Sequence, residues 1–582
     1  MITFILVFFV ITSCTSSEQL INSDWYEVET EHFRIVTNDN PKRIQKLAVD
    51  LEKFRVFARN YIHFSPDQQK LTIYALSDRM SFEGMSGVEN AGRTIGRFQN
   101  TSHGSFALLN LKGNKYLPDN PARQTLFHEY THFLTHSHSQ QNYPYWFSEG
   151  VAEVFSTVAF DKNNNFRVGD IPVDRAISLS RSKVLPLGAL LEAVPGAINA
   201  RDTEALYASG WMLSHWLIFD AERLEGLNKY LSAYNNGADP VAALPAALGM
   251  TFEELESLYQ KLRKTDFQYY KGLFSSKEVS ESINVQALEN HKAIAEIAHF
   301  MAITGQEAET LKEFIAYAEQ KAVSSSALLS ALAIAEAKQE NYSSAREILD
   351  EIAEKNRDET SYLEAAAMVF LYEALAAGKM DDVQKFKKIR DAYVTLVNTK
   401  GDVPAYWHEL AITMQVLGYP RSQYVKILEQ AYLRAPRDIN IAWWYAHELY
   451  LSRDTEMFIR VTQPLLMQIT SLESRKHLSS MMVELQPAGR PQVEQGAAKN
   501  GLGQLLSEYR FLSENKALAI AMDYRGAYVV GYIENSASQS EANEVALQAC
   551  EAQREQHQVK DRCELYLEEE VIVGAAETSQ VL

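Results

Sequence analysis

The chain has 582 residues, of which 46% are hydrophobic and 23% are charged, and both proportions are ordinary for a folded globular protein. At roughly 100–200 residues per domain, this length indicates about three to five domains. The formal net charge of −19 and the lack of any basic run argue against a nucleic-acid partner, because phosphate binding requires clustered Lys and Arg.

A short apolar run occupies residues 2–11 (ITFILVFFVI). It is shorter than the about 20 residues that a spanning helix needs, and it matches the apolar core of a signal peptide. The run leads into Ile11-Thr12-Ser13-Cys14, which resembles a bacterial lipobox, where the cysteine is lipidated and becomes the mature N-terminus. No Lys or Arg precedes the run, which departs from the usual export signal. The alternative is an ordinary cleaved signal peptide with an incidental cysteine.

The lipobox resemblance implies that residues 1–23 form a signal peptide, a lipobox and a polar tether. The protein would then be anchored by lipid in the bacterial cell envelope, on the periplasmic side and in the outer membrane. If Cys14 carries lipid, Cys550 and Cys563 remain as a pair, which an oxidising compartment can keep as a disulfide. The alternative is two free, buried thiols.

The segment 24–275 begins with strands and continues with helices. The alternation in 25–37 predicts a half-buried strand, and helical spacing of apolar residues follows over 41–60. Two buried strands are expected at 71–76 and 105–111. Together these elements predict a mixed α/β lobe.

A helix is predicted to start at Asn120-Pro121, where a capping side chain precedes a proline, and to run to about His136. A second helix is expected over WFSEGVAEVFSTVA, and the chain is helical in pattern from about 185 to 264. Segment 24–275 is therefore expected to combine the mixed lobe with a helical lobe.

Residues 285–487 are almost wholly helical in pattern. Two stretches, 327–356 and 405–438, resemble tetratricopeptide repeats, in which small residues let paired helices pack closely. The second stretch carries matching residues at about the expected spacings: Trp407, Leu410, Gly418, Ala431 and Pro436. Such an array would serve as a surface for substrate or for an envelope protein partner. An irregular helical bundle is the alternative.

A linker rich in Pro, Gly, Gln and Ala is expected over 488–503, followed by a small ββαβ domain over 504–582 that contains the cysteine pair. The predicted fold class is therefore multidomain α+β: a mixed α/β lobe, a helical lobe, a helical solenoid and this small domain.

The strongest chemical signal is His128-Glu129-Tyr130-Thr131-His132, which matches the H-E-x-x-H pattern. Residues four apart share one face of a helix, so two imidazoles can converge on one ion, while Glu129 lies about 100° around the helix. Nitrogen and oxygen ligands favour zinc. Apolar neighbours on both sides of the motif indicate that its polar face lines a cleft.

This motif, followed after a 16-residue gap by Glu149 in WFSEGVAE, resembles the gluzincin metallopeptidases, and most closely the bacterial peptidase-MA-like domains. The resemblance spans about residues 25–265 and includes the strand opening His32-Phe33-Arg34-Ile35-Val36-Thr37. It implies a helical gluzincin-type lobe with Zn²⁺ bound by His128, His132 and Glu149. It also implies Glu129 as general base and proton donor to the leaving amine.

Further roles follow from the same resemblance. Glu153, one turn after Glu149, is expected to bind the far nitrogen of a ligand histidine, the alternative being a solvated carboxylate. Tyr207 and His215 are candidates for stabilising the oxyanion, the alternative being ordinary core residues. The strand 105–111 is expected where gluzincins place the edge strand that pairs with substrate.

The predicted function is hydrolysis of peptide bonds in a protein or peptide substrate by zinc-activated water. One alternative is an inactive envelope scaffold that acts through its helical repeats. Another is a zinc amidase acting on cell-wall peptide.

Overall fold

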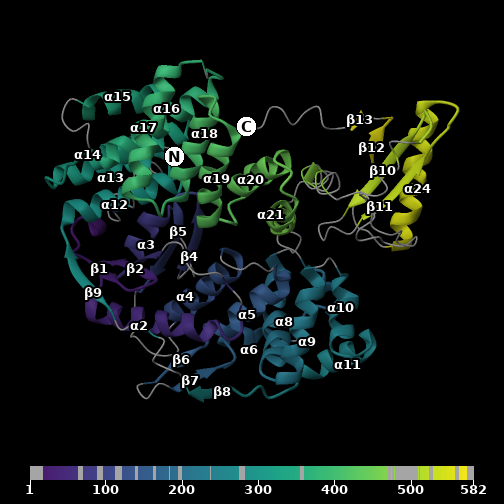
Figure 1. The fold of residues 1–582 in the computed structure, drawn as a ribbon. Helices are drawn as coiled ribbons and strands as arrows, with labels where there is room; N and C mark the ends of the chain where they lie inside the picture. The colour runs from purple at the N-terminus through teal and green to yellow at the C-terminus, as the bar shows by residue number, and fades with distance from the viewer. Residues whose placement is uncertain are drawn as a thin grey trace, which may run out of the picture.

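The computed structural model describes residues 17–62, 64, 70–87, 96–111, 121–137, 142–161, 165–181, 184–193, 200–235, 238–273, 279, 282–353, 359–379, 381–469, 474, 477, 478, 481, 485, 509, 512–522, 528–557, 563–569 and 571–572. In these ranges the chain is a mainly helical, mixed α and β protein with small sheets (Figure 1), which is compatible with the predicted multidomain α+β class. Cys14 and the expected linker 488–503 lie outside the described residues. Among the helices described, none is both long and apolar enough to cross a bilayer.

The N-terminal part is built on a six-stranded sheet in the order β4-β5-β3-β2-β1-β9. Strands β2, β3 and β5 are parallel to one another, whereas β4, β1 and β9 pair antiparallel with their neighbours. The strands are β1 (Trp25–Glu29), β2 (Phe33–Thr37), β3 (Leu71–Leu76), β4 (Gly96–Thr101), β5 (Gly104–Asn110) and β9 (Asn284–Leu288).

Both faces of the central strands β2, β3 and β5 are largely buried, whereas the edge strand β9 is mostly exposed. Successive side chains of a strand point to opposite faces, and Ile35 and Ile73 enter one core while Val36 and Tyr74 enter another. The first core contains α2 (Pro41–Ala58), and the second contains helices from the C-terminal side of β9. The expectation of one half-buried strand over 25–37 is therefore wrong: the segment forms two strands, each covered on both faces.

Two expected boundaries differ in the structure. Residues 17–21 are helical, and Leu20 and Ile21 are each 1% exposed, so this part of the expected tether packs on the body of the protein. The Trp25 indole donates a hydrogen bond to the carbonyl of Leu20 at 3.1 Å. Strand β9, which the sequence grouped with the repeats, pairs along its whole length with β1.

A helical lobe follows β5 in the chain. Its helices are α4 (Pro121–His132), the π-helix η1 (Phe133–Ser137), α5 (Tyr145–Ser156), α6 (Val173–Ser180), α7 (Leu187–Leu191), α8 (Ala200–Ile218), α9 (Ala221–Asn235), α10 (Pro240–Ala247) and α11 (Phe252–Leu262). A small sheet in the order β6-β7-β8 pairs the segment that follows α5 with the segment that follows α11. Its strands are β6 (Ala159–Phe160), β7 (Asn165–Val168) and β8 (Tyr270–Leu273).

A helical array covers the second face of the large sheet (Figure 1). Its helices are α12 (Asn290–Ile303), α13 (Ala308–Gln320), α14 (Ser326–Lys338), α15 (Tyr342–Ala353), α16 (Thr360–Ala376), α17 (Val383–Thr399), α18 (Pro404–Val416), α19 (Arg421–Arg434), α20 (Ile439–Leu451) and α21 (Thr455–Gln468). The two repeat-like stretches are helix pairs, α14 with α15 and α18 with α19. Arg34 of β2 binds Glu296 of α12 through two hydrogen bonds of 2.6 and 2.7 Å.

The C-terminal domain has a four-stranded sheet in the order β11-β10-β12-β13, with one helix against it. Its elements are β10 (Ala517–Met522), β11 (Tyr528–Ile533), α24 (Gln539–His557), β12 (Glu564–Glu568) and β13 (Val571–Ile572). The expected ββαβ unit thus gains one short strand. The predicted disulfide is confirmed: Cys550 of α24 is bonded to Cys563, directly before β12.

Replacing both Cys550 and Cys563 with Ala should destabilise this domain by about 3 kcal/mol, because the bridge closes a short loop and restricts the unfolded chain. The measurement is pulse proteolysis across a urea series. The urea concentration at which half of the chains are cleaved within 512–572 should fall by about 2 M. Reduction of the wild-type protein should give the same shift. An unchanged midpoint in both experiments would contradict a stabilising bridge.

Candidate metal centre

Helix α4 presents His128 and His132 side by side. Its opposite side is anchored in the main core through Leu126, Phe127 and Tyr130, each at most 1% exposed. The two imidazoles, four residues apart, lie on the remaining face with their ring centroids 4.7 Å apart. The α-helix ends at His132, and the chain continues as the π-helix η1.

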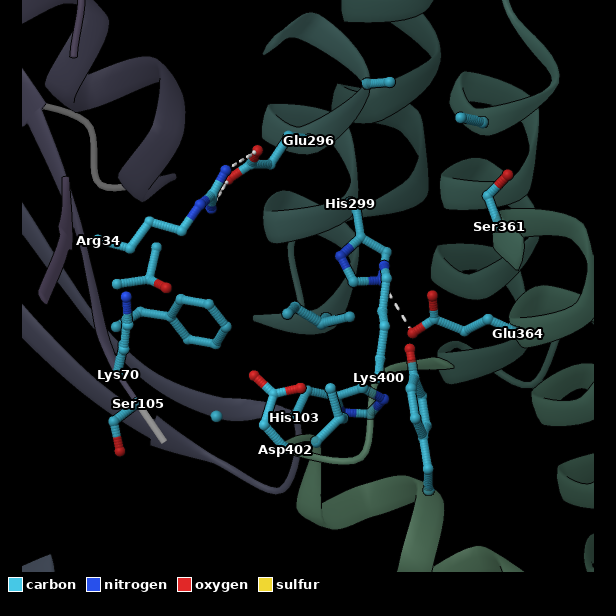
Figure 2. A pocket seen from close by; sticks show the side chains of 18 of the residues that line it. Arg34, Lys70, His103, Ser105, Glu296, His299, Ser361, Glu364, Lys400 and Asp402 are labelled. Atoms are coloured by element: carbon cyan, nitrogen blue, oxygen red, sulfur yellow. Dashed lines mark hydrogen bonds and ion pairs between the residues drawn. The ribbon is translucent and has the colours of Figure 1, made fainter. Parts of the chain in front are cut away.

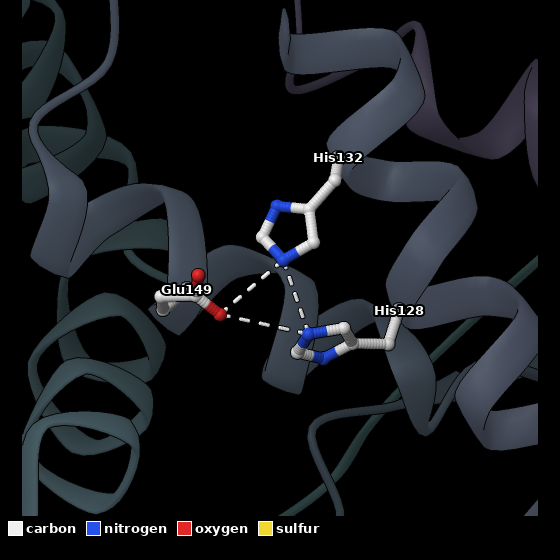
Figure 3. Close-up of side chains that lie close together, drawn as sticks. All are labelled: His128, His132 and Glu149. Carbon is white, nitrogen blue, oxygen red and sulfur yellow. Dashed lines mark hydrogen bonds and ion pairs between the residues drawn. The ribbon is translucent and has the colours of Figure 1, made fainter. Parts of the chain in front are cut away.

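Helix α5 brings Glu149 against the two imidazoles (Figure 3). Oε2 of Glu149 lies 3.2 Å from Nε2 of His132 and 3.6 Å from Nε2 of His128. The two Nε2 atoms are 3.1 Å apart. Three donor atoms from two helices therefore surround one point.

This donor set fits a metal ion. Ligand atoms bound tetrahedrally to zinc at 2.0–2.1 Å lie about 3.3 Å from one another, which is close to the three separations found here. Oε2 of Glu149 is buried, and in the described part of the chain it makes no well-aligned hydrogen bond. A buried carboxylate oxygen is costly unless it is paired or coordinated, and a cation at the centre of the three atoms would satisfy it.

The charges agree with this arrangement. Burial alone would lower the pKa of His128, but contact with Glu149 and the nearby charge of Glu153 outweigh it and raise the pKa to about 9. Burial alone would raise the pKa of Glu149, but the charge of His132 and contacts with both imidazoles hold it well below its usual range. The site is therefore an ionised carboxylate that attracts positive charge.

The outer nitrogens of both imidazoles also face polar groups. Oε1 of Glu153 lies 3.7 Å from Nδ1 of His128, and the same oxygen is 3.2 Å from Arg175 of α6. The hydroxyl of Ser148 lies 3.3 Å from Nδ1 of His132. Glu153 thus lies on the side of His128 that the sequence indicated, at ion-pair distance, and its role in binding the ring stays a prediction. Arg175 and Ser148 were not predicted, and neither carries a sequence signal that would identify it.

The two oxyanion candidates on α8 lie in different surroundings. The Tyr207 ring is 6.4 Å from that of His128, and its hydroxyl is hydrogen-bonded to Tyr145, whose pKa is raised to about 12, mainly by burial. His215 is eight residues further along α8, about 12 Å along the axis. It is 3% exposed and donates to the Gly169 carbonyl at 3.1 Å, so it does not join the centre. Its role as an oxyanion donor stays a prediction, and these surroundings do not support it.

Glu129 follows His128 on α4 and is half-buried. Its charge contributes to raising the pKa of His128. Glu129 is not one of the three donors, and its role as general base stays a prediction.

The position of α5 depends on contact with α8 at two glycines. A Cβ on Gly150 would lie 2.3 Å from both the Gly210 carbonyl oxygen and Ser214 Oγ. A Cβ on Gly210 would lie 2.6 Å from the Trp146 carbonyl oxygen. The backbones therefore approach as closely as only glycine permits, one residue after Glu149.

The edge of the sheet beside α4 is β4, not the strand predicted at 105–111. That strand is β5, which lies between β4 and β3. A Cβ on Gly96 of β4 would lie 2.8 Å from Cγ2 of Thr125, so the edge strand runs directly against the helix of the two histidines.

Comparisons of the chain with protein-family models, with curated proteins and with solved structures found no match. The description of this centre therefore rests on its geometry and chemistry.

Gly150→Ala should displace α5 from α8, because backbone atoms of Gly210 cannot yield as a flexible side chain would. We expect a loss of about 3 kcal/mol in stability, which corresponds to a fall of about 5–10 °C in the melting temperature of this lobe. Gly188→Ala in α7 is the matched control, because its Cβ would find only Phe252 at 3.8 Å. Equal melting temperatures for the two variants in calorimetry would contradict the close contact.

Proposed function

We propose that this chain is a zinc-dependent peptidase of the gluzincin type, with the metal bound by His128, His132 and Glu149. The observation that carries the proposal is the convergence of three donor atoms separated by 3.1–3.6 Å. One of them is a buried carboxylate oxygen that has no aligned hydrogen bond within the described ranges. In this proposal the large sheet and helices α4 to α11 form the peptidase domain, and α12 to α21 form a solenoid of tetratricopeptide type.

The protein groups around the metal would each have a defined task. Zinc bound to this set supplies Lewis acidity and lowers the pKa of a coordinated water. Glu129 takes the proton of the attacking water and delivers it to the leaving amine. Tyr207 and Tyr145 offer hydroxyl donors to the oxyanion of the substrate. Glu153 and Ser148 hold the outer nitrogens of the imidazoles and so fix their orientation.

The proposed substrate is an extended segment of a protein or peptide. Strand β4 is the edge strand next to α4, and an edge strand can hydrogen-bond to an added strand. A peptide paired with β4 would run alongside the helix that carries the catalytic groups. An amide of cell-wall peptide would reach the same groups. The cleavage assay described below therefore compares the two substrate classes.

We further propose that the protein works in the bacterial cell envelope, held by lipid at Cys14, with its helical array available to a partner protein. The disulfide supports an oxidising compartment. The helical segment 17–21 follows Cys14 closely and packs on the sheet domain, so a lipid at Cys14 would hold that domain near the membrane.

Two single substitutions test the proposal. Glu149→Ala should reduce the zinc content from about one ion per chain to about a tenth of that or less, because it removes one of three protein ligands. Glu129→Gln should keep the zinc and lower the cleavage rate about 10³-fold or more, because it removes the general base. Zinc is measured by elemental mass spectrometry, and cleavage on libraries of peptides and of cell-wall fragments.

Glu253→Ala in α11 is the control, because its side chain is exposed and α11 carries none of the three donors. It should leave both zinc and activity unchanged. A wild-type protein that binds zinc but cleaves neither library would refute the enzymatic function and favour a scaffold. Zinc retained by Glu149→Ala would refute the proposed ligand set.

A further inference from the structure

A cavity of about 510 Å³ lies between the large sheet and the helical array (Figure 2). Its walls come from β2, β3 and β5 on one side and from α12, α14, α16 and the start of α18 on the other. It opens on the second face of the sheet, whereas α4 and the candidate metal centre belong to the first. The volume is in the range of pockets that bind small molecules.

Two buried polar atoms in its wall have no hydrogen-bond partner among the residues that the structure describes. These are Nε2 of His103, a residue 7% exposed, and Oγ of Ser330, a residue 2% exposed. Burial lowers the pKa of His103 to about 3, so its ring is neutral. An unpaired buried polar group costs about 1–3 kcal/mol, which a ligand that bonds to both atoms would recover.

The charges around the cavity are balanced and mostly paired with each other. Arg34 binds Glu296, and Glu364 accepts a hydrogen bond of 3.0 Å from His299. The pKa of Glu364 would be raised by burial, but the charge of His299 lowers it to about 2, so this carboxylate stays ionised.

Lys400 and Asp402, at the exposed side of the cavity, differ from these pairs. Within the described ranges neither side chain makes an ion pair, although they lie two residues apart and line the same opening (Figure 2). Both side chains are exposed, so the mouth offers a ligand one cation and one anion. The charge of Lys400 also acts on Glu364, and that of Asp402 acts on Arg434. A ligand with a carboxylate and an ammonium group can pair with both, whereas a polyanion would meet the carboxylates of Glu296, Glu364 and Asp402.

We propose that this cavity is a binding site for a small zwitterion, either a free amino acid or a short peptide with both termini unblocked. Lys400 binds the carboxylate of the ligand and Asp402 binds its ammonium group. His103 and Ser330 hydrogen-bond to its interior amide or carboxylate atoms. Phe106 and Tyr406 form the apolar wall for side chains.

The test is calorimetric titration of full-length Glu129→Gln, a variant chosen so that peptide probes are not hydrolysed. The probes are L-alanine, tri-L-alanine and N-acetyl-tri-L-alanine amide, which has the shape of the peptide but neither charge. We expect a saturable signal with at least one of the two zwitterions, and about 10-fold or weaker binding of the blocked peptide. The zwitterion that binds more tightly decides whether the ligand is a free amino acid or a short peptide.

Matched variants locate the binding. Lys400→Met and Asp402→Asn should each weaken it about 10-fold, and Ser330→Ala should weaken it as well. Lys388→Met, an exposed lysine on α17 away from the cavity, should leave it unchanged. Adding Glu149→Ala should also leave it unchanged, because the metal centre lies on the other face of the sheet. Binding that is abolished by Glu149→Ala and unaffected by Lys400→Met and Asp402→Asn would overturn the proposal, as would equal affinity for the blocked peptide.

Discussion

The candidate metal centre depends on the contact between α5 and α8, because that contact fixes the backbone beside Glu149. At Gly150 and Gly210 the two helices touch through backbone atoms, so neither can slide or rotate without a clash. The same contact fixes the position of Tyr207 relative to α5, because Tyr207 lies about one turn before Gly210 on α8. Helix α4 lies on another side of α5, and its core residues hold the two imidazoles at the level of the carboxylate. A carboxylate buried in this way must be paired, and among the described residues its ion-pair contacts are the two imidazoles, which a shared cation would complete.

A second constraint joins the large sheet to the helical array. A sheet buried on both faces needs helices on both, and here the second layer comes from the array. Strand β9 extends the sheet immediately before α12 begins, so the chain enters the array as a continuation of the sheet. The array is therefore part of the same folded body as the sheet. The cavity lined by Lys400 and Asp402 exists because polar residues interrupt this otherwise apolar interface.

The sequence predicted those parts of the site that depend on spacing within one helix. The pair His128 and His132, and the position of Glu149 on a following helix, are set by helical periodicity, which is local. Features that depend on how distant segments meet were missed or misplaced. His215 was expected at the centre because nothing in α8 indicates which of its turns faces α4. Arg175 contacts Glu153 from another helix, and no local sequence pattern predicts such a contact.

The strands show the same limit. The alternation over 25–37 identified β structure correctly, but it did not indicate the turn that divides the segment into two strands. It also did not indicate the second buried face, which depends on helices from a distant part of the chain. Similarly, β4 was not predicted, and its place at the edge follows from its pairing with β5. This hairpin connects the two candidate sites. Its turn, residues 102–103, meets the array where the Ala405 amide donates to the Ser102 carbonyl at 2.6 Å, and His103 in the turn lines the cavity. Its outer strand runs past Thr125 on α4. A ligand in the cavity would thus touch one end of a two-stranded element whose flank borders the proposed substrate path.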